Sequence, residues 1–300
     1  MKKKLLIVLV GIFGFFIFIQ AMHQNTVVQK NVQIAVVDVQ GKPTDALLQL
    51  LELTGIEHDG SLASIVQVTQ KSQAEWLRKQ GTKRWDIAET NPENKDQFFV
   101  LFHQLFMINE IKPSLQKYDY VLWTGATFKP AKSRLRYLIE IWESGVRFDT
   151  VVLLSGARPL LESEKSYMIS AYNLDEATCP QTEFEMMKFV YDTIVMPEDM
   201  RQVPIVMIDV PMQITKTGIL AYPTTGDTVN LWMASNPTPG TCLVISNQPY
   251  VGYQDSVSRS LLPKDFIVET VGKESQDTKI GIYLDTLARN LYQENKTRNL

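Results

Sequence analysis

The sequence predicts an α/β fold, a doubly wound and mostly parallel Rossmann-like sheet with helices on both faces and a helical N-terminal annex. Short apolar runs alternate with helix-length segments from about residue 118 onward, which is the order that a sheet built from strand–helix–strand units requires. Several of these runs end directly in turns that contain glycine or threonine. Residues 32–117 lack this alternation and have mostly helical patterns. We therefore expect two regions, a mostly helical one over 32–117 and the Rossmann-like domain over 118–300.

The two regions differ in the elements that they predict. In the N-terminal region a single β-branched stretch predicts a strand, and segments with cap residues or helical spacing predict three helices. These four elements are 32–39, 44–53, 61–80 and 91–111. In the C-terminal region the apolar runs predict strands over 118–123, 150–154, 205–210, 242–246 and 266–271. Helices are expected over 132–144, 182–192, 224–235, 250–261 and 279–294. Strands interleaved with helices in this way are covered on both faces.

Residues 1–23 resemble an export signal, and a polar tether over 24–31 follows them. Lysines at positions 2, 3 and 4 precede an unbroken apolar run from Leu5 to Ile19, as in a signal peptide or a signal anchor. Cleavage after Ala21 and retention as an anchor both stay open, because Ile19 is bulky for its place in a signal-peptidase site. The lysines are expected to stay in the cytoplasm. We therefore expect an exported, periplasmic or extracytoplasmic protein, either anchored in the inner membrane or secreted.

Composition excludes some classes of function. The 300 residues are 45% apolar and 21% charged with a net charge of -3, and no basic stripe is present that would bind nucleic acid. The three histidines are scattered and no Cys-x-x-Cys pair occurs, so we expect neither a zinc site nor a histidine-based triad. Cys179 and Cys242 can form one disulfide in an oxidising compartment or remain two buried thiols. The expected partners are a small molecule, the inner membrane through the N-terminal segment, and an envelope protein.

The candidate site lies in the loops that follow the strands, because open parallel sheets bind ligands at the carboxyl ends of their strands. Gly125 and Gly156 each follow a strand, where a missing side chain lets the backbone approach a ligand; alternatively, they only turn the chain. Thr127 supplies a hydroxyl, and Arg158 supplies a guanidinium that pairs with anions. Two such loops favour an anionic or nucleotide-like ligand, although the sequence has neither a dinucleotide-binding motif nor a P-loop.

Two helix starts add polar groups with two alternative roles. Thr225, Asp227 and Asn230 either cap and begin a helix or point into the crevice as ligand contacts. Glu183, at the start of another helix, has the same two alternatives. Asp227 and Glu183 are therefore the candidate acid/base groups.

The loop after the fourth strand contributes amides rather than a base. Ser246, Asn247 and Gln248 are suited to orienting a ligand, but amides do not act as general bases near neutral pH. The candidate ligand-binding residues are thus Gly125, Thr127, Ser155, Gly156, Arg158, Thr225, Asp227, Asn230, Ser246, Asn247 and Gln248.

The order of these motifs resembles the YdcF/SanA/ElyC-like family of bacterial envelope proteins (domain of unknown function 218). The features that carry the resemblance are Asp119–Gly125, Arg134, Ser155-Gly156, Glu183, the segment 224–230 and Ser246. The resemblance covers about residues 118–271 and implies a Rossmann-like sheet, often behind one N-terminal membrane segment, with a role in envelope or peptidoglycan-precursor maintenance. It also implies nucleotide-type ligands, S-adenosylmethionine among them. The pocket that it implies consists of Gly125, Ser155, Gly156, Glu183, Thr225, Asp227, Asn230 and Ser246.

The chain departs from the family pattern at two places. The family commonly has a histidine-centred motif where this chain has residues 247–250, Asn-Gln-Pro-Tyr, and a second glycine after Ser-Gly where this chain has Ala157-Arg158. The first departure removes the best acid/base candidate, and the second replaces bare backbone with a charged side chain. We therefore expect an envelope protein that binds an anionic or nucleotide-like molecule and leave catalysis open. The alternative is a non-catalytic envelope interaction or scaffold protein whose helical N-terminal region docks a partner.

Overall fold

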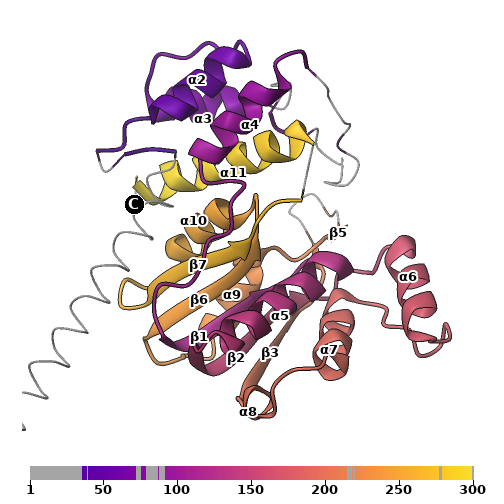
Figure 1. Cartoon of the computed structure of the whole chain (residues 1–300). Coiled ribbons are helices and arrows are strands. Elements are labelled where there is room, and N and C mark those ends of the chain that lie inside the picture. Colours follow the sequence, from indigo (N-terminus) through magenta and orange to yellow (C-terminus); the bar gives the residue numbers. More distant parts are fainter. Residues whose placement is uncertain are drawn as a thin grey trace, which may run out of the picture.

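A five-stranded parallel sheet forms the centre of the molecule (Figure 1). The computed structural model describes residues 36–298 except 39, 72–75, 79–86, 88–91, 215–217, 219 and 277–278. The strands of the sheet are β1 (Lys117–Thr124), β2 (Arg147–Gly156), β3 (Ile205–Val210), β6 (Thr241–Asn247) and β7 (Ile267–Lys273). They lie in the order β3-β2-β1-β6-β7, and every neighbouring pair is parallel. The α/β Rossmann-like fold that the sequence predicts is therefore confirmed.

The strand order reverses between β1 and β6. The chain builds outward from β1 through β2 to β3, then returns to place β6 on the other side of β1. Val121 in β1 consequently pairs with Val151 of β2 on one side and with Leu243 of β6 on the other. In such sheets the connections that follow the two strands at the reversal run in opposite directions and leave a crevice at the carboxyl ends of the strands.

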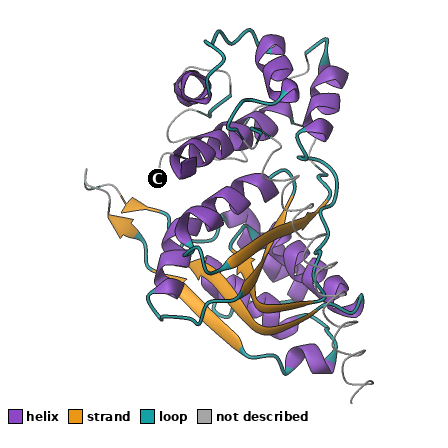
Figure 2. Ribbon diagram, turned by 90° about the vertical axis from the view of Figure 1, so that its left-hand side faces the viewer, coloured by secondary structure: helices purple, strands orange, loops and turns teal. Residues whose placement is uncertain are grey.

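Helices cover both faces of the sheet because its strands are apolar on both faces (Figure 2). One face packs against α5 (Phe128–Glu143) and α7 (Glu183–Thr193), with α6 (Glu162–Tyr172) and the short α8 (Glu198–Arg201) at its margin. The other face packs against α9 (Thr225–Met233), which contacts α10 (Val251–Leu261). Side chains alternate between the faces along each strand, as the pleat requires.

A helical unit, defined here as α2 (Asp45–Leu53), α3 (Leu62–Gln70), α4 (Lys95–Gln104) and α11 (Ile280–Arg298), forms a second core. It lies at the top of Figure 1, where α11 separates the other three helices from the sheet. The rings of Phe102 and Tyr283 stack in this core with centroids 4.4 Å apart. The last helix of the chain therefore completes a core that the N-terminal helices begin.

The contact between α10 and α11 joins the helical unit to the sheet and is strongly polar. Ser256 donates a hydrogen bond to Asn290, and both side chains are buried. Arg259 pairs with Asp255 at 2.7 Å and also with Glu294. These polar partners satisfy one another, which is the condition for burying them.

The structure differs from the sequence-based expectations at several elements. Of the strand expected over 32–39, the described residues show only an isolated bridge between Val37 and Pro43. The helix expected over 61–80 ends at Gln70, and the one expected over 91–111 is confined to Lys95–Gln104. The sequence did not predict α6, or the antiparallel pair β4 (Gln213–Ile214) and β5 (Leu220–Ala221).

The export signal and tether expected over 1–31 lie outside the described residues. Among the helices that the structure describes, none has the length and apolar character needed to cross a membrane.

Candidate functional site

A small pocket, called here the strand-end pocket, lies at the carboxyl ends of β1 and β2. Its volume is about 70 Å³, which is on the order of two water molecules at ~30 Å³ each. It is lined by the strand ends and by the first residues of α7 and α9: Gly125, Leu154, Gly156, Arg158, Glu183, 223–225 and Thr228. Of the candidates from the sequence, Gly125, Gly156, Arg158, Glu183 and Thr225 thus come together at one place. The pocket admits one small polar group, not a whole nucleotide.

Glu183 is the principal titratable group of the strand-end pocket. It is the first residue of α7, and one of its carboxyl oxygens accepts a hydrogen bond from Arg158 Nε at 2.7 Å. The other oxygen, Oε1, lies 3.4 Å from the Ser155 hydroxyl. Burial raises the pKa of the Glu183 carboxyl, and the positive charges of Arg158 and Arg134 oppose that rise without cancelling it. A carboxyl with a raised pKa at a strand end is suited to proton transfer or to donating a hydrogen bond to a ligand.

Arg158 is held between two carboxylates. Its Nη1 lies 2.9 Å from Oε2 of Glu164, and its Nε lies 2.7 Å from Glu183. Nη1 also donates to the carbonyl of Pro159. Arg158 is only 8% exposed, so its charge is already balanced by the protein. Any anion that enters the pocket competes with Glu183 for this group.

The two glycines that follow the strands make room for protein atoms. A side chain at Gly125 would overlap Oε1 of Glu183. At Gly156 its first carbon would lie 2.7 Å from the carbonyl oxygen of Val210 and 2.8 Å from Pro223. Gly156 therefore requires glycine for close packing, because its neighbours are backbone and a proline ring, whereas Gly125 leaves the room in which the Glu183 carboxyl approaches the end of β1.

The segment 224–230 forms a capping box at the start of α9. Asp227 Oδ2 accepts hydrogen bonds from the backbone amide and the hydroxyl of Thr224, and the Thr224 hydroxyl accepts one from the amide of Asp227. Asn230 is exposed further along the helix, and neither Asp227 nor Asn230 lines the strand-end pocket. The first-turn amides of Thr225 and Gly226 have no acceptor within the helix. Of the two acid/base candidates, Glu183 is thus the one that faces the pocket.

The crevice between β1 and β6 is filled by polar groups of the chain itself. Arg134 of α5 is 4% exposed, and its Nη1 donates to the carbonyls of Thr124 and Gly125 at 3.0 and 2.9 Å. Its Nε donates to Oδ1 of Asn247 at 2.9 Å. These bonds tie the ends of β1 and β6 together.

Gln248 continues this connection to the segment that follows α4. Its side-chain amide donates to the carbonyls of Phe106 and Asn109 at 2.8 and 3.0 Å. Asn247 and Gln248 therefore join elements of the protein to one another. Ser246 is buried, and its hydroxyl has no hydrogen-bond partner among the described residues; its side chain lies outside the strand-end pocket.

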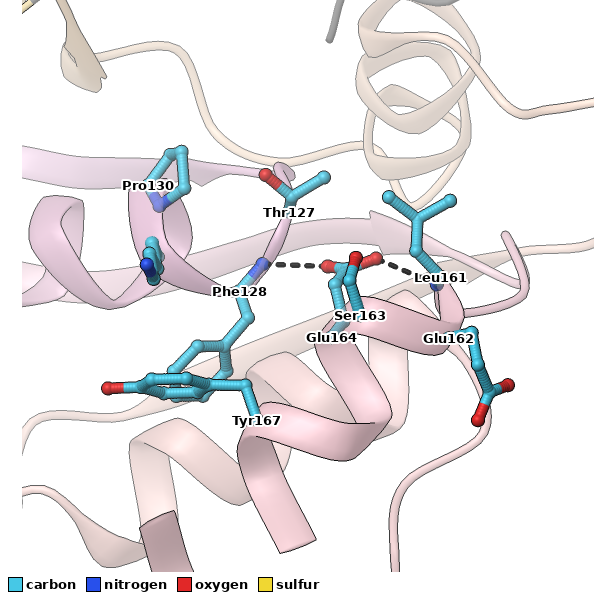
Figure 3. A pocket seen from close by; sticks show the side chains of 9 residues that line it. Thr127, Phe128, Pro130, Leu161, Glu162, Ser163, Glu164 and Tyr167 are labelled. Atoms are coloured by element: carbon cyan, nitrogen blue, oxygen red, sulfur yellow. Dashed lines mark hydrogen bonds between the residues drawn. The ribbon is translucent and has the colours of Figure 1, made fainter. Parts of the chain in front are cut away.

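A larger pocket, called here the α5–α6 pocket, lies across the Arg158–Glu164 ion pair from the strand-end pocket. Figure 3 shows the larger pocket from close by. It has a volume of about 570 Å³ and is lined by the first turn of α5 (127–130), the first turn of α6 (161–164) and Tyr167. Thr127 belongs to this pocket and not to the smaller one. Glu164 stands between the two, because its carboxylate lines the larger pocket and pairs with Arg158, which lines the smaller.

Reasoning from the sequence missed Glu164 because it missed α6. The helix lacks an apolar stripe, since only Glu164 and Met168 are buried in it. The available signal was a glutamate three residues after the N-cap position, Leu161, whose amide donates to the Glu164 carboxylate.

The two cysteines are free and buried. Cys179 packs in the core under α5 and α7, whereas Cys242 packs in the core on the opposite face of the sheet. The sheet lies between them, so they cannot form a disulfide in this fold. The described residues contain no group of three or more His, Cys, Asp or Glu side chains that could hold a metal ion.

Comparison with known proteins adds no relative: no family model matches the chain, and no curated protein or solved structure matches it either. The resemblance to the YdcF/SanA/ElyC-like family therefore stays a prediction.

Proposed function

We propose that this chain is a bacterial envelope protein whose Rossmann-like domain binds an anionic or nucleotide-like small molecule at the carboxyl ends of β1 and β2. The observation that carries the proposal is the Glu183 carboxyl, which faces the strand-end pocket and whose Oε1 has the Ser155 hydroxyl at 3.4 Å. The first-turn amides of α9 lie at the same pocket and favour a negatively charged group.

The Glu183 carboxyl and the first-turn amides of α9 can contact the same anion because the carboxyl takes up a proton. An anion in the pocket disfavours the charged carboxylate and adds to the effect of burial, which already raises the pKa. Binding is therefore accompanied by proton uptake, and the protonated carboxyl donates a hydrogen bond to the anion. In an enzyme the same group would act as the general acid; in a binding protein it makes affinity depend on pH.

Thermal unfolding of the full chain with sulfate, ATP and S-adenosylmethionine tests the proposal. Sulfate keeps a fixed charge, so a pH dependence of its binding reports on the protein. Measured at pH values from 4.5 upward, sulfate affinity should fall as the pH rises through the raised pKa of Glu183, because the carboxyl then loses its proton. Glu183→Gln should bind sulfate with a flat pH profile.

Asp192→Asn is the matched control, since Asp192 makes the same charge change on the same helix and lies exposed at its far end. It should retain the wild-type profile. If neither sulfate nor either nucleotide-type compound stabilises the wild-type chain at any of these pH values, the proposal fails.

One observation favours the alternative of a non-catalytic envelope interaction protein. Arg158, the expected anion partner, already donates to Glu164, Glu183 and Pro159, and the strand-end pocket is small. On this alternative the site only holds loops together, and Glu183→Gln changes stability without changing any binding.

A further inference from the structure

The α5–α6 pocket has the size and the walls of a ligand site in its own right. Its volume of about 570 Å³ falls in the range of roughly 300–1,000 Å³ that is typical of small-molecule sites. The strand-end pocket, at about 70 Å³, is below that range. A ligand larger than a single polar group must therefore place most of its atoms elsewhere, and the larger pocket lies across the Arg158–Glu164 ion pair from the smaller one.

Two aromatic rings form the wall of the α5–α6 pocket. The Phe128 and Tyr167 rings have centroids 5.3 Å apart at an interplanar angle of 47°. Phe128 is 3% exposed and fixed in the core, whereas Tyr167 is 44% exposed and presents its ring to the pocket. Figure 3 shows the two rings next to each other, Phe128 on α5 and Tyr167 on α6. Exposed aromatic surface of this kind stacks favourably on another planar ring.

The rim of the pocket is polar. The ammonium of Lys129 lies 5.3 Å from the centroid of the Tyr167 ring, and Glu162 and Ser163 line the opposite side at the start of α6. A heteroaromatic ring, with acceptors and N–H donors at its edge, can pair with these groups. An acyl chain has no polar atoms along its length that pair with them.

The pocket is preformed because Glu164 clamps its two helix starts together. One carboxylate oxygen accepts from the amide of Phe128 at 2.8 Å, and the other accepts from the amide of Leu161 at 2.9 Å (Figure 3). The same carboxylate pairs with Arg158 in the strand-end pocket. The two pockets therefore lie on the two sides of one buried ion pair and are held in fixed relation to each other.

We propose that the α5–α6 pocket binds a planar heteroaromatic ring, stacked on Tyr167, on the far side of the buried Arg158–Glu164 pair from the anion that the proposed function assigns to the strand-end pocket. This inference rests on the proposed function for the anionic half only. The ring half is carried by the cavity, its aromatic wall and its polar rim.

Calorimetric titration of the full chain with adenosine, octanoate and sulfate separates the two halves. Adenosine carries the ring without an anion, octanoate carries an apolar chain, and sulfate carries the anion alone. We expect the wild-type chain to bind adenosine and not octanoate. Tyr167→Ala should weaken adenosine binding by about tenfold or more, as loss of a stacked base typically does, while Tyr167→Phe keeps the ring and the affinity. Neither variant should change sulfate binding.

Tyr167 is nearly half exposed, so Tyr167→Ala is expected to fold, and its thermal unfolding is recorded alongside. Absence of adenosine binding, equal adenosine affinity in wild type and Tyr167→Ala, or preference for octanoate would each overturn the inference. If adenosine does not bind and sulfate still binds with the pH dependence described above, the proposed function stands and only the ring site is refuted. If adenosine binds and sulfate does not, the ring site stands without the anionic half.

Discussion

Replacement of Glu164 is expected to be among the most destabilising single changes at the carboxyl edge of the sheet. The carboxylate is 7% exposed and accepts from the amides of Phe128 and Leu161 and from two nitrogens of Arg158, at 2.8, 2.9, 2.9 and 3.3 Å. Hydrogen bonds to a charged group are worth roughly 1.5–3 kcal/mol each, and breaking a buried ion pair costs about 3–5 kcal/mol. Arg158 would still pair with Glu183 after the replacement, which limits the loss of free energy of unfolding.

We therefore expect Glu164→Ala to lower the free energy of unfolding by about 3–5 kcal/mol and Glu164→Gln, which keeps one acceptor oxygen, by about half of that. Urea denaturation followed by circular dichroism measures both. Glu162→Gln is the control: Glu162 is exposed in the same first turn, and its loss should cost no more than about 1 kcal/mol through the helix dipole. A loss of less than about 1 kcal/mol in Glu164→Ala would refute the assignment of this carboxylate as the clamp between α5 and α6.

Three further predictions concern packing, thiol chemistry and pH. Gly272→Ala places a methyl group 2.8 Å from the Cα of Asn247 and should lower the free energy of unfolding, measured by urea denaturation, by about 1–3 kcal/mol. Gly226→Ala is the control, because no atom lies nearer than 3.4 Å, and it should not lower that free energy; equal losses in the two variants would contradict the packing argument. Burial raises the pKa of the Cys242 thiol to about 12, so Ellman's reagent should react with it only after unfolding, and fast labelling of the native chain would contradict this. Because burial raises the pKa of Glu183 above its ordinary 4.5, folding takes up a proton there. The stability of the wild type relative to Glu183→Gln should therefore fall as the pH rises from 4.5 through that raised pKa, and a stability difference independent of pH would contradict this.

The sequence predicted the sheet well because its strands are short apolar runs with clear ends. All five expected strands occur, for example Cys242–Ser246 within β6 and Ile205–Val210 as β3. The order of the strands across the sheet depends on which face each connecting helix covers, and tertiary packing decides this. The helix expected over 279–294 also occurs, but its periodicity does not show that it packs against helices from the opposite end of the chain.

The candidate site was predicted incompletely. Gly125, Gly156, Arg158, Glu183 and Thr225 meet at one pocket because each follows or precedes an element at the same edge of the sheet. Residues at the same edge do not all face the same way: Asp227 turns back to cap its own helix and Asn247 turns to Arg134. Side-chain direction depends on the local partner, which loop position alone does not specify.

The helical unit also constrains the order in which the protein can fold. Phe102 and Leu50 are fully buried in a core that α11 completes from the other end of the described chain. During synthesis α2, α3 and α4 leave the ribosome before the sheet does, and the apolar side chains that α11 covers stay exposed until the sheet has been made. Contacts between residues so far apart in sequence form slowly, and uncovered apolar helices are prone to aggregation or to capture by chaperones. A chain that stops after β7 would contain every strand of the sheet and still expose the core of its N-terminal helices.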